Sequence, residues 1–140
     1  MQFETAAAGP GYEVGMPPVL LVALGGALGS VLRWLVGTAL NPVFAAFPLG
    51  TFLVNLLGSA ALAAIGTAAE RGSVASPGLA LFLTTGVMGG FTTYSSFNWE
   101  VARLFRDGQP GAAVTYLGAT MGCCLAGAAL GAWGVGRGLG

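Results

Sequence analysis

The chain has 140 residues, of which 55% are hydrophobic and only 7% are charged. A soluble domain usually carries about 25% charged residues, so this composition excludes an ordinary water-soluble domain and indicates a membrane protein. Five basic and five acidic residues leave no net charge, which argues against nucleic acid as a partner, and the lack of histidine removes the commonest general base and metal ligand.

The sequence predicts an all-α membrane protein with a short N-terminal tail. Residues 1–17 form a polar segment that contains Glu4 and Glu13 and lacks the basic start of a secretory signal. Residues 18–137 contain four segments that reach the roughly 20 apolar residues needed to span a membrane. We expect a single domain of four transmembrane helices, covering residues 19–40, 49–69, 78–105 and 112–135.

The first span combines closely spaced glycines with one basic residue. Gly25 and Gly29 are four residues apart, a spacing that lets two helices approach closely. The same spacing recurs in the fourth span, at Gly118/Gly122 and Gly127/Gly131. Arg33 lies near the end of the first span, where its long side chain can reach the membrane surface.

Two spans carry stripes of polar residues at four-residue intervals, which place each stripe on one helix face. The stripes are Thr51, Asn55 and Ser59 in the second span and Tyr116, Thr120 and Cys124 in the fourth. Polar residues in membrane helices either join helices or line a pathway, and each residue taken alone fits the first role better. Two stripes together favour a pathway.

The third span is long and rich in glycine. A continuous helix of this length would exceed the hydrocarbon thickness, at about 1.5 Å per residue. Gly86, Gly89 and Gly90 weaken a helix near its middle. We expect a break between Met88 and Thr93, buried in protein or facing water or an ion, because lipid cannot satisfy free backbone groups. Close helix packing through these glycines is an equally good alternative.

Aromatic and acidic residues follow the expected break. Tyr94 and Phe97 share a helix face, and inward ring edges can stabilise a small anion, although ordinary packing explains the pair as well. Glu100 is either a boundary residue near Arg103 or an intramembrane carboxylate of a proton-coupled transporter. Small dual-topology drug exporters carry an acid in the first span, where this chain has Arg33 instead.

The fourth span contains the two cysteines. Cys123 and Cys124 are adjacent, and neighbouring side chains diverge on a helix, so a disulfide between them is not expected. We interpret both as small packing residues rather than as redox or metal-binding groups.

The distribution of basic residues shows almost no bias toward one membrane orientation. Arg71 and Arg137 lie on the side of the chain ends, and Arg103 and Arg106 lie on the other, joined by Arg33 if it reaches the surface. So weak a bias allows insertion in both orientations. Two copies would then pair antiparallel about a twofold axis.

Three stretches carry a resemblance to a known family: GGALGSVLRW in the first span, GTFLVNLLGS in the second and GVMGGFTTYSSFNWE in the third. In order and spacing the chain resembles the Fluc/CrcB family of fluoride channels across all four spans, with only the N-terminal tail outside. The resemblance implies an antiparallel, dual-topology homodimer that holds two fluoride pathways in the cell (inner) membrane.

The resemblance also implies roles for particular residues. Backbone carbonyls of Gly89 and Thr92 from both subunits would cage a structural sodium ion at the break. Arg33 would lie near the aqueous vestibule. Together with Thr51 of the second-span stripe, the fluoride pathway would comprise Asn55, Tyr94, Ser95, Ser96, Phe97, Glu100, Tyr116, Thr120 and Cys124.

Two of these residues depart from the family's pattern. Tyr94 stands where phenylalanine is usual and adds a hydroxyl, and Cys124 stands where serine is typical and is a weaker donor. The expected function is passive export of fluoride, which protects the cell when hydrogen fluoride enters from acidic surroundings and ionises inside. Such a protein is not an enzyme. The alternative is a small proton-coupled multidrug-type exporter of dual topology.

Overall fold

The computed structural model describes residues 16–40 and 47–138, which are helical with no strand among them. The all-α class is therefore confirmed for this part of the chain. The elements are α1 (Pro18–Leu40), α2 (Leu49–Glu70), α3 (Pro77–Leu81), the π-helical η1 (Phe82–Met88), α4 (Gly89–Phe91), α5 (Tyr94–Arg106) and α6 (Pro110–Gly138). Most of the polar tail expected at residues 1–17 lies outside the described residues.

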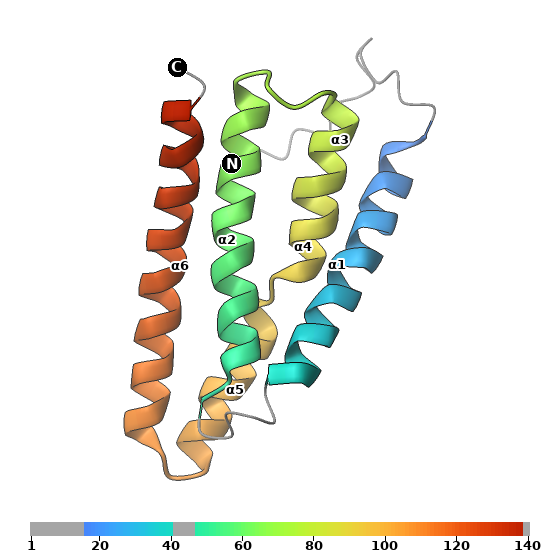
Figure 1. Cartoon of the computed structure of the whole chain (residues 1–140). Helices are drawn as coiled ribbons and strands as arrows, with labels where there is room; N and C mark the ends of the chain where they lie inside the picture. Colours follow the sequence, from blue (N-terminus) through green and yellow to red (C-terminus); the bar gives the residue numbers. More distant parts are fainter. Residues whose placement is uncertain (1–15, 41–46, 139–140) are drawn as a thin grey trace.

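The helix axes are roughly aligned, and Figure 1 shows that α1 and α3–α5 run in one direction while α2 and α6 run in the opposite one. α2 packs along α6, and α1 packs against η1 and α4. α5 continues beyond α4 toward the end of the molecule where α6 begins, and it packs against α6. The start of α1 and the end of α6 lie at the same end of the molecule, together with the connection between α2 and α3 (Figure 1).

Local signals explain where the helices of the third and fourth segments begin. Ser76 accepts a hydrogen bond from the Leu79 amide (3.1 Å) and is followed by Pro77, a pairing that starts α3. The turn before α6 contains Gly108 at φ +70°, a conformation that favours glycine, and α6 starts at Pro110.

α1 approaches the third segment so closely that side chains would not fit between the backbones. A Cβ on Gly25 would lie 2.7 Å from the Phe82 carbonyl oxygen and 2.8 Å from Gly86 Cα. A Cβ on Gly29 would meet the Val87 carbonyl oxygen. Glycine is therefore required at both positions of this pair. Gly86 also serves close helix packing, which was the alternative to its weakening the third span.

The glycine pairs of α6 differ from each other. Gly127 and Gly131 face α2, where a Cβ on Gly131 would meet the Ala60 carbonyl oxygen. A Cβ on Gly118 or Gly122 would meet no described atom within 4 Å. The expected close contact between helices is thus found for Gly127/Gly131, which face α2. Gly118/Gly122 instead form a surface of small residues that no described residue covers.

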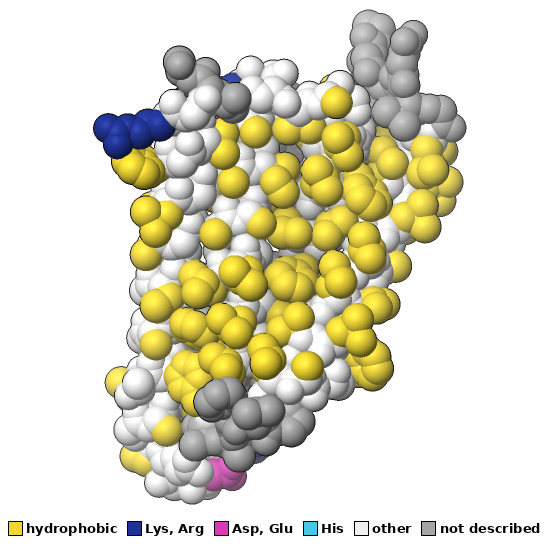
Figure 2. Space-filling model, viewed as in Figure 1, with side chains coloured by type: hydrophobic (Ala, Val, Ile, Leu, Met, Phe, Trp, Pro, Cys, Tyr) yellow, Lys and Arg dark blue, Asp and Glu magenta, His cyan; other side chains and the backbone are white. Residues whose placement is uncertain are grey.

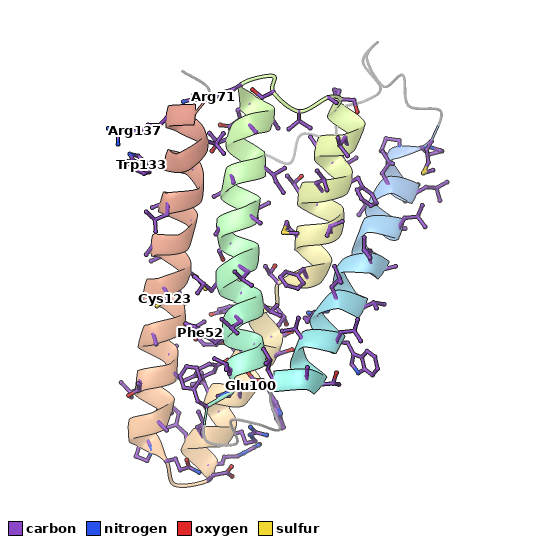
Figure 3. All side chains as sticks on the ribbon, viewed as in Figure 1. Phe52, Arg71, Glu100, Cys123, Trp133 and Arg137 are labelled. Carbon is purple, nitrogen blue, oxygen red and sulfur yellow. The ribbon has the colours of Figure 1, made fainter. Side chains whose placement is uncertain are left out.

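The surface is apolar along the length of the helices. Three helices, α1, α2 and α6, are long and apolar enough to cross a membrane. Figure 2 shows hydrophobic side chains over the middle of the visible face and charged side chains near its two ends. Arg137 lies over the Trp133 ring (4.6 Å to its centroid) near the end of α6, beside Arg71 (Figure 3). This distribution suits a lipid-facing surface with polar and aromatic rims.

Candidate functional site: the junction of α4 and α5

The helical backbone stops for two residues between α4 and α5. α4 ends at Phe91, and Thr92 and Thr93 have extended backbone, with φ/ψ of −75/156° and −151/117°. α5 begins at Tyr94 because Thr93 caps it: Thr93 Oγ1 accepts a hydrogen bond from the Ser96 amide (3.3 Å). Thr93 Oγ1 also donates to Ser96 Oγ (3.0 Å). Hydroxyl groups therefore surround the two-residue junction.

Asn55 of α2 binds the junction with both ends of its side-chain amide. Asn55 Nδ2 donates to the Thr93 carbonyl oxygen (2.9 Å), and the Thr93 amide donates to Asn55 Oδ1 (2.7 Å). These bonds satisfy the backbone groups that a continuous helix would have paired. Only a side-chain amide offers a donor and an acceptor in this arrangement, so asparagine is suited to the position in a way that aspartate is not.

Two backbone carbonyls near the junction lose their usual helical donors. In a continuous helix the carbonyls of Gly89 and Thr92 would accept from the amides of Thr93 and Ser96. Those two amides bind side-chain oxygens instead. These are the carbonyls for which the sequence resemblance implies a sodium ion.

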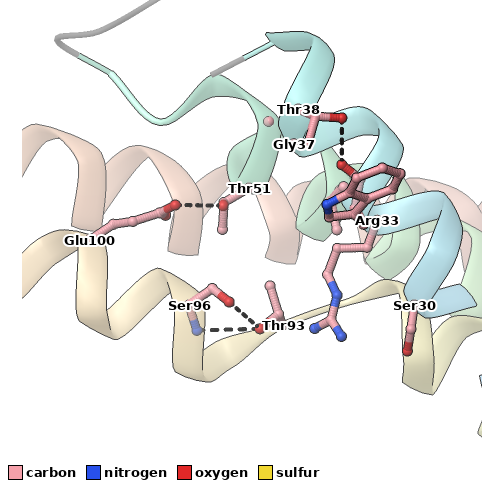
Figure 4. A pocket seen from close by; sticks show the side chains of 11 residues that line it. Ser30, Arg33, Gly37, Thr38, Thr51, Thr93, Ser96 and Glu100 are labelled. Carbon is pink, nitrogen blue, oxygen red and sulfur yellow. Dashed lines mark hydrogen bonds between the residues drawn. The ribbon is translucent and has the colours of Figure 1, made fainter. Parts of the chain in front are cut away.

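A pocket of about 650 Å³ on one side of the junction has opposite charges in its wall (Figure 4). Arg33 of α1 and Glu100 of α5 both line it, together with the hydroxyls of Thr51 and Thr93. Arg33 Nη1 donates to the Thr92 carbonyl oxygen (3.3 Å), which places the guanidinium next to the junction. We call this the larger pocket.

Two hydrogen bonds to other helices hold the Glu100 carboxyl group in place. Glu100 Oε1 accepts from Thr51 Oγ1 of α2 (2.8 Å), and Oε2 accepts from the Tyr116 hydroxyl of α6 (2.7 Å). Tyr116 is fully buried, and its ring contacts Phe47 (5.0 Å between centroids) and Phe97 (5.3 Å). Glu100 of α5 is therefore hydrogen-bonded to both α2 and α6.

A second pocket, of about 210 Å³, lies against the same junction, and we call it the smaller pocket. Asn55, Thr93 and Phe97 line it, together with Thr120 and Cys124 of α6. The Thr120 side chain is only 3% exposed, and its hydroxyl has no hydrogen-bond partner among the described residues. Buried hydroxyls normally have a partner, so a small ligand or a water molecule in this pocket would complete the site.

The predicted site residues fall into three groups. Thr51, Ser96 and Glu100 line the larger pocket with Arg33. The predicted residues that line the smaller pocket are Asn55, Thr92, Tyr94, Phe97, Thr120 and Cys124. The other three line neither pocket: Tyr116 is buried beside Glu100, and Ser95 and Gly89 are exposed on the single chain.

Thr93 is the site residue that the sequence reasoning overlooked. It lines both pockets, binds Asn55 through its backbone and caps α5 through its side chain. Its sequence signal was a hydroxyl residue directly before a helical segment, which is typical of an N-cap. Ser30 and Thr38, which also line the larger pocket, carried no comparable signal.

The arrangement suits the passage of a small anion better than it suits a reaction. Thr93 lines both pockets, and hydroxyl, amide and guanidinium groups in their walls are hydrogen-bond donors. Such donors can replace part of the hydration shell of an anion. The carboxylate in the larger pocket, Glu100, already accepts hydrogen bonds from Thr51 and Tyr116. Among the described residues, no group of three cysteine, aspartate or glutamate side chains could hold a metal ion.

Comparisons with known proteins agree with this chemistry. The sequence model of the family described as "CrcB-like protein, Camphor Resistance (CrcB)" matches residues 20–132. A protein of Anaeromyxobacter dehalogenans called "Fluoride-specific ion channel FluC" is 53% identical over 114 residues, which cover 81% of this chain and 90% of that protein. A protein of the same name from Chlorobium chlorochromatii is 48% identical, over 71% of this chain and 77% of its own length.

Proposed function

This chain belongs to the CrcB family, and on that basis we propose that it is a fluoride-selective channel that lets fluoride leave the cell down its gradient. The observation that carries the proposal is the identity with fluoride-specific ion channels over most of their length. The protein resides in the membrane and is not an enzyme. The donor-lined pockets at the α4–α5 junction support the proposal because a poorly polarisable, strongly hydrated anion needs donors to replace its water.

The proposed mechanism is passive conduction through donor-lined spaces. Arg33 attracts the anion into the larger pocket, and the Asn55 amide and the Thr120 hydroxyl lie in the wall of the smaller one. A fixed cation deep in the path would hold the anion, so neutral donors suit the narrow part and the arginine suits its mouth. Tyr94 and Phe97 contribute ring edges, whose centroids lie 6.1 Å apart.

We further propose that residues 77–106 cross the membrane as one span that is interrupted at Thr92 and Thr93. α5 continues from α4 in the same direction along the molecule (Figure 1). An even number of crossings places the start of α1 and the end of α6 on the same side of the membrane. Both lie at the same end of the molecule in Figure 1. The Asn55 side chain supports such an interruption, because it supplies the hydrogen bonds that lipid cannot.

The proposed assembly is an antiparallel homodimer of two oppositely oriented copies. Basic residues are balanced between the ends, with Arg71 and Arg137 at one and Arg103 and Arg106 at the other. The open small-residue surface at Gly118/Gly122 of α6 gives a second helix room to approach.

We propose that the carbonyls of Gly89 and Thr92 hold a structural sodium ion in that dimer. The donor set fits, because carbonyl oxygens suit a hard cation and the amides that usually engage these two are bound elsewhere. Two carbonyls are few for one cation, so a second copy would contribute two more. When bound, the ion would supply positive charge to the Gly89 carbonyl, and at the Thr92 carbonyl it would replace the Arg33 guanidinium, which donates there in the single chain.

Fluoride efflux from liposomes tests the proposed function. Liposomes that contain the purified full-length chain and are loaded with fluoride should release it rapidly without any pH gradient, as measured with a fluoride electrode. Protein-free liposomes and chloride-loaded liposomes are the controls, and both should release their anion far more slowly. Efflux that required a proton gradient would instead identify an exporter, and no efflux at all would contradict the proposal.

A further inference from the structure

One of the two cysteines lies in the wall of the smaller pocket and the other does not. Cys124 lines this pocket and is partly buried. Cys123, its neighbour on α6 (labelled in Figure 3), is exposed. It is not among the residues that line the pocket. Consecutive side chains on a helix point about 100° apart, so the two thiols face different surroundings although they are adjacent in sequence.

The wall around Cys124 is mostly apolar but contains hydroxyl groups and an amide, and one of these hydroxyls has no partner among the described residues. Thr120 lies one helical turn before Cys124, and its hydroxyl is buried without a partner among the described residues. The Ser59 hydroxyl of α2 lies beside the Cys124 thiol. Thr120, whose hydroxyl is unpaired among the described residues, lines the same pocket as Cys124, and the thiol offers a softer ligand atom than the hydroxyl groups beside it.

We propose that Cys124 is a binding site for soft, thiol-binding metal cations, and that a metal bound there blocks anion passage. Sulfur is the ligand that such cations prefer, whereas the hydroxyl and amide groups of the same wall are hard donors. With methylmercury chloride, a sulfur–mercury bond forms, the sulfur–hydrogen and mercury–chloride bonds break, and the proton and the chloride ion go to water. No oxidant or reductant takes part. The inference rests on the proposed function, because it concerns the same path.

The size of the pocket explains why one adduct is enough. At about 210 Å³ the smaller pocket has about a third of the volume of the larger one, so a bound group leaves less room beside it for an anion. A heavy-atom group on Cys124 would occupy space shared with Asn55 and Phe97 and would cover the Thr120 hydroxyl. A group on Cys123 would extend away from the pocket and leave this space open.

The chain supplies its own matched pair of test variants, because it contains only two cysteines. Cys123→Ser keeps Cys124 as the sole thiol, and Cys124→Ser keeps Cys123. Each protein is reconstituted in liposomes, treated with methylmercury chloride and compared with its own untreated efflux rate. We expect wild type and Cys123→Ser to lose at least roughly tenfold in fluoride efflux, with recovery on addition of excess small thiol, and Cys124→Ser to stay within about twofold.

Peptide mass spectrometry of the same samples locates the adduct independently of transport. The inference is overturned if Cys123→Ser conducts normally after treatment, or if no adduct forms on Cys124. Equal inhibition of Cys124→Ser would also overturn it. If Cys124→Ser proves inactive when untreated, the response of Cys123→Ser to methylmercury and the location of the adduct by mass still test the inference. Absence of efflux from untreated wild type would refute the proposed function, whereas normal efflux that treatment leaves unchanged would refute this inference alone.

Discussion

At the scale of single residues, Asn55 determines how the α4–α5 junction is stabilised. Its amide donates to the Thr93 carbonyl oxygen and accepts from the Thr93 amide, so one side chain satisfies both backbone groups. Leaving such a partly buried group without a partner costs about 1–3 kcal/mol. The same amide lines the smaller pocket. Asn55 therefore joins the stability of the junction to the polarity of the proposed pathway.

Replacing Asn55 by aspartate tests this dual role. In Asn55→Asp, a carboxylate oxygen replaces the nitrogen that donates to the Thr93 carbonyl, and a negative charge enters the anion's path. We expect fluoride efflux from liposomes to fall at least roughly tenfold. Asn98→Asp adds the same charge to an exposed position of α5 and should conduct normally. Undiminished efflux through Asn55→Asp would remove Asn55 from the pathway.

At the scale of helices, the contact of α1 with η1 and α4 positions one wall of the larger pocket. Gly25 and Gly29 let the α1 backbone approach the third segment, and Arg33 follows one turn after Gly29. The close approach brings the Arg33 guanidinium to the Thr92 carbonyl, a contact between residues 59 positions apart. Helix packing by small residues thus determines where the Arg33 side chain lies.

Gly25→Ala should weaken this contact. The added Cβ would lie within 3 Å of three backbone atoms of η1, so the helices must move apart, at a cost of about 1–3 kcal/mol. Thermal unfolding of the purified protein in detergent, followed by circular dichroism, measures the loss. The matched control is Gly26→Ala, whose Cβ meets no described atom within 4 Å and which should be neutral or slightly stabilising. Equal melting temperatures for the two variants would contradict the packing argument.

At the scale of the whole molecule, charge balance bears on how the chain inserts. α2 is linked to α6 at one end by Arg71, whose Nη1 donates to the Gly136 carbonyl oxygen (2.9 Å). At the other end, Arg106 lies over the Trp99 ring, 4.5 Å from its centroid. Each end thus carries an arginine contact and an aromatic rim, and neither end is strongly preferred for the cytoplasm.

Reporter fusions test the proposed dual topology. A compartment-dependent reporter at the C-terminus should give signal for both sides of the membrane. Two lysines added at the exposed connection between α2 and α3, Ser73→Lys and Ala75→Lys, should bias that end to the cytoplasm and abolish one of the two signals. A single orientation in the unmodified chain would contradict the antiparallel dimer.

The fold class could be predicted from the amino-acid sequence, because composition and apolar length are properties of the chain alone. The low charge content and the apolar segments indicated a membrane protein, and the all-helical class and the family are confirmed. Glycine spacing predicted close helix contacts, which the structure has at Gly25/Gly29 and Gly127/Gly131. The roles of single residues in conduction stay predictions.

Which polar groups meet could not be predicted from the sequence and follows from the packing of the helices. Asn55 and Thr93 are 38 positions apart, and Glu100 binds one donor 49 positions before it and another 16 after it. Their meeting depends on how far each helix is rotated about its axis and shifted along it. Helical periodicity places residues on a face, but it does not specify the opposing helix or the register. The π-helical η1, which shifts the register of the third segment before the junction, carried no such signal in the sequence.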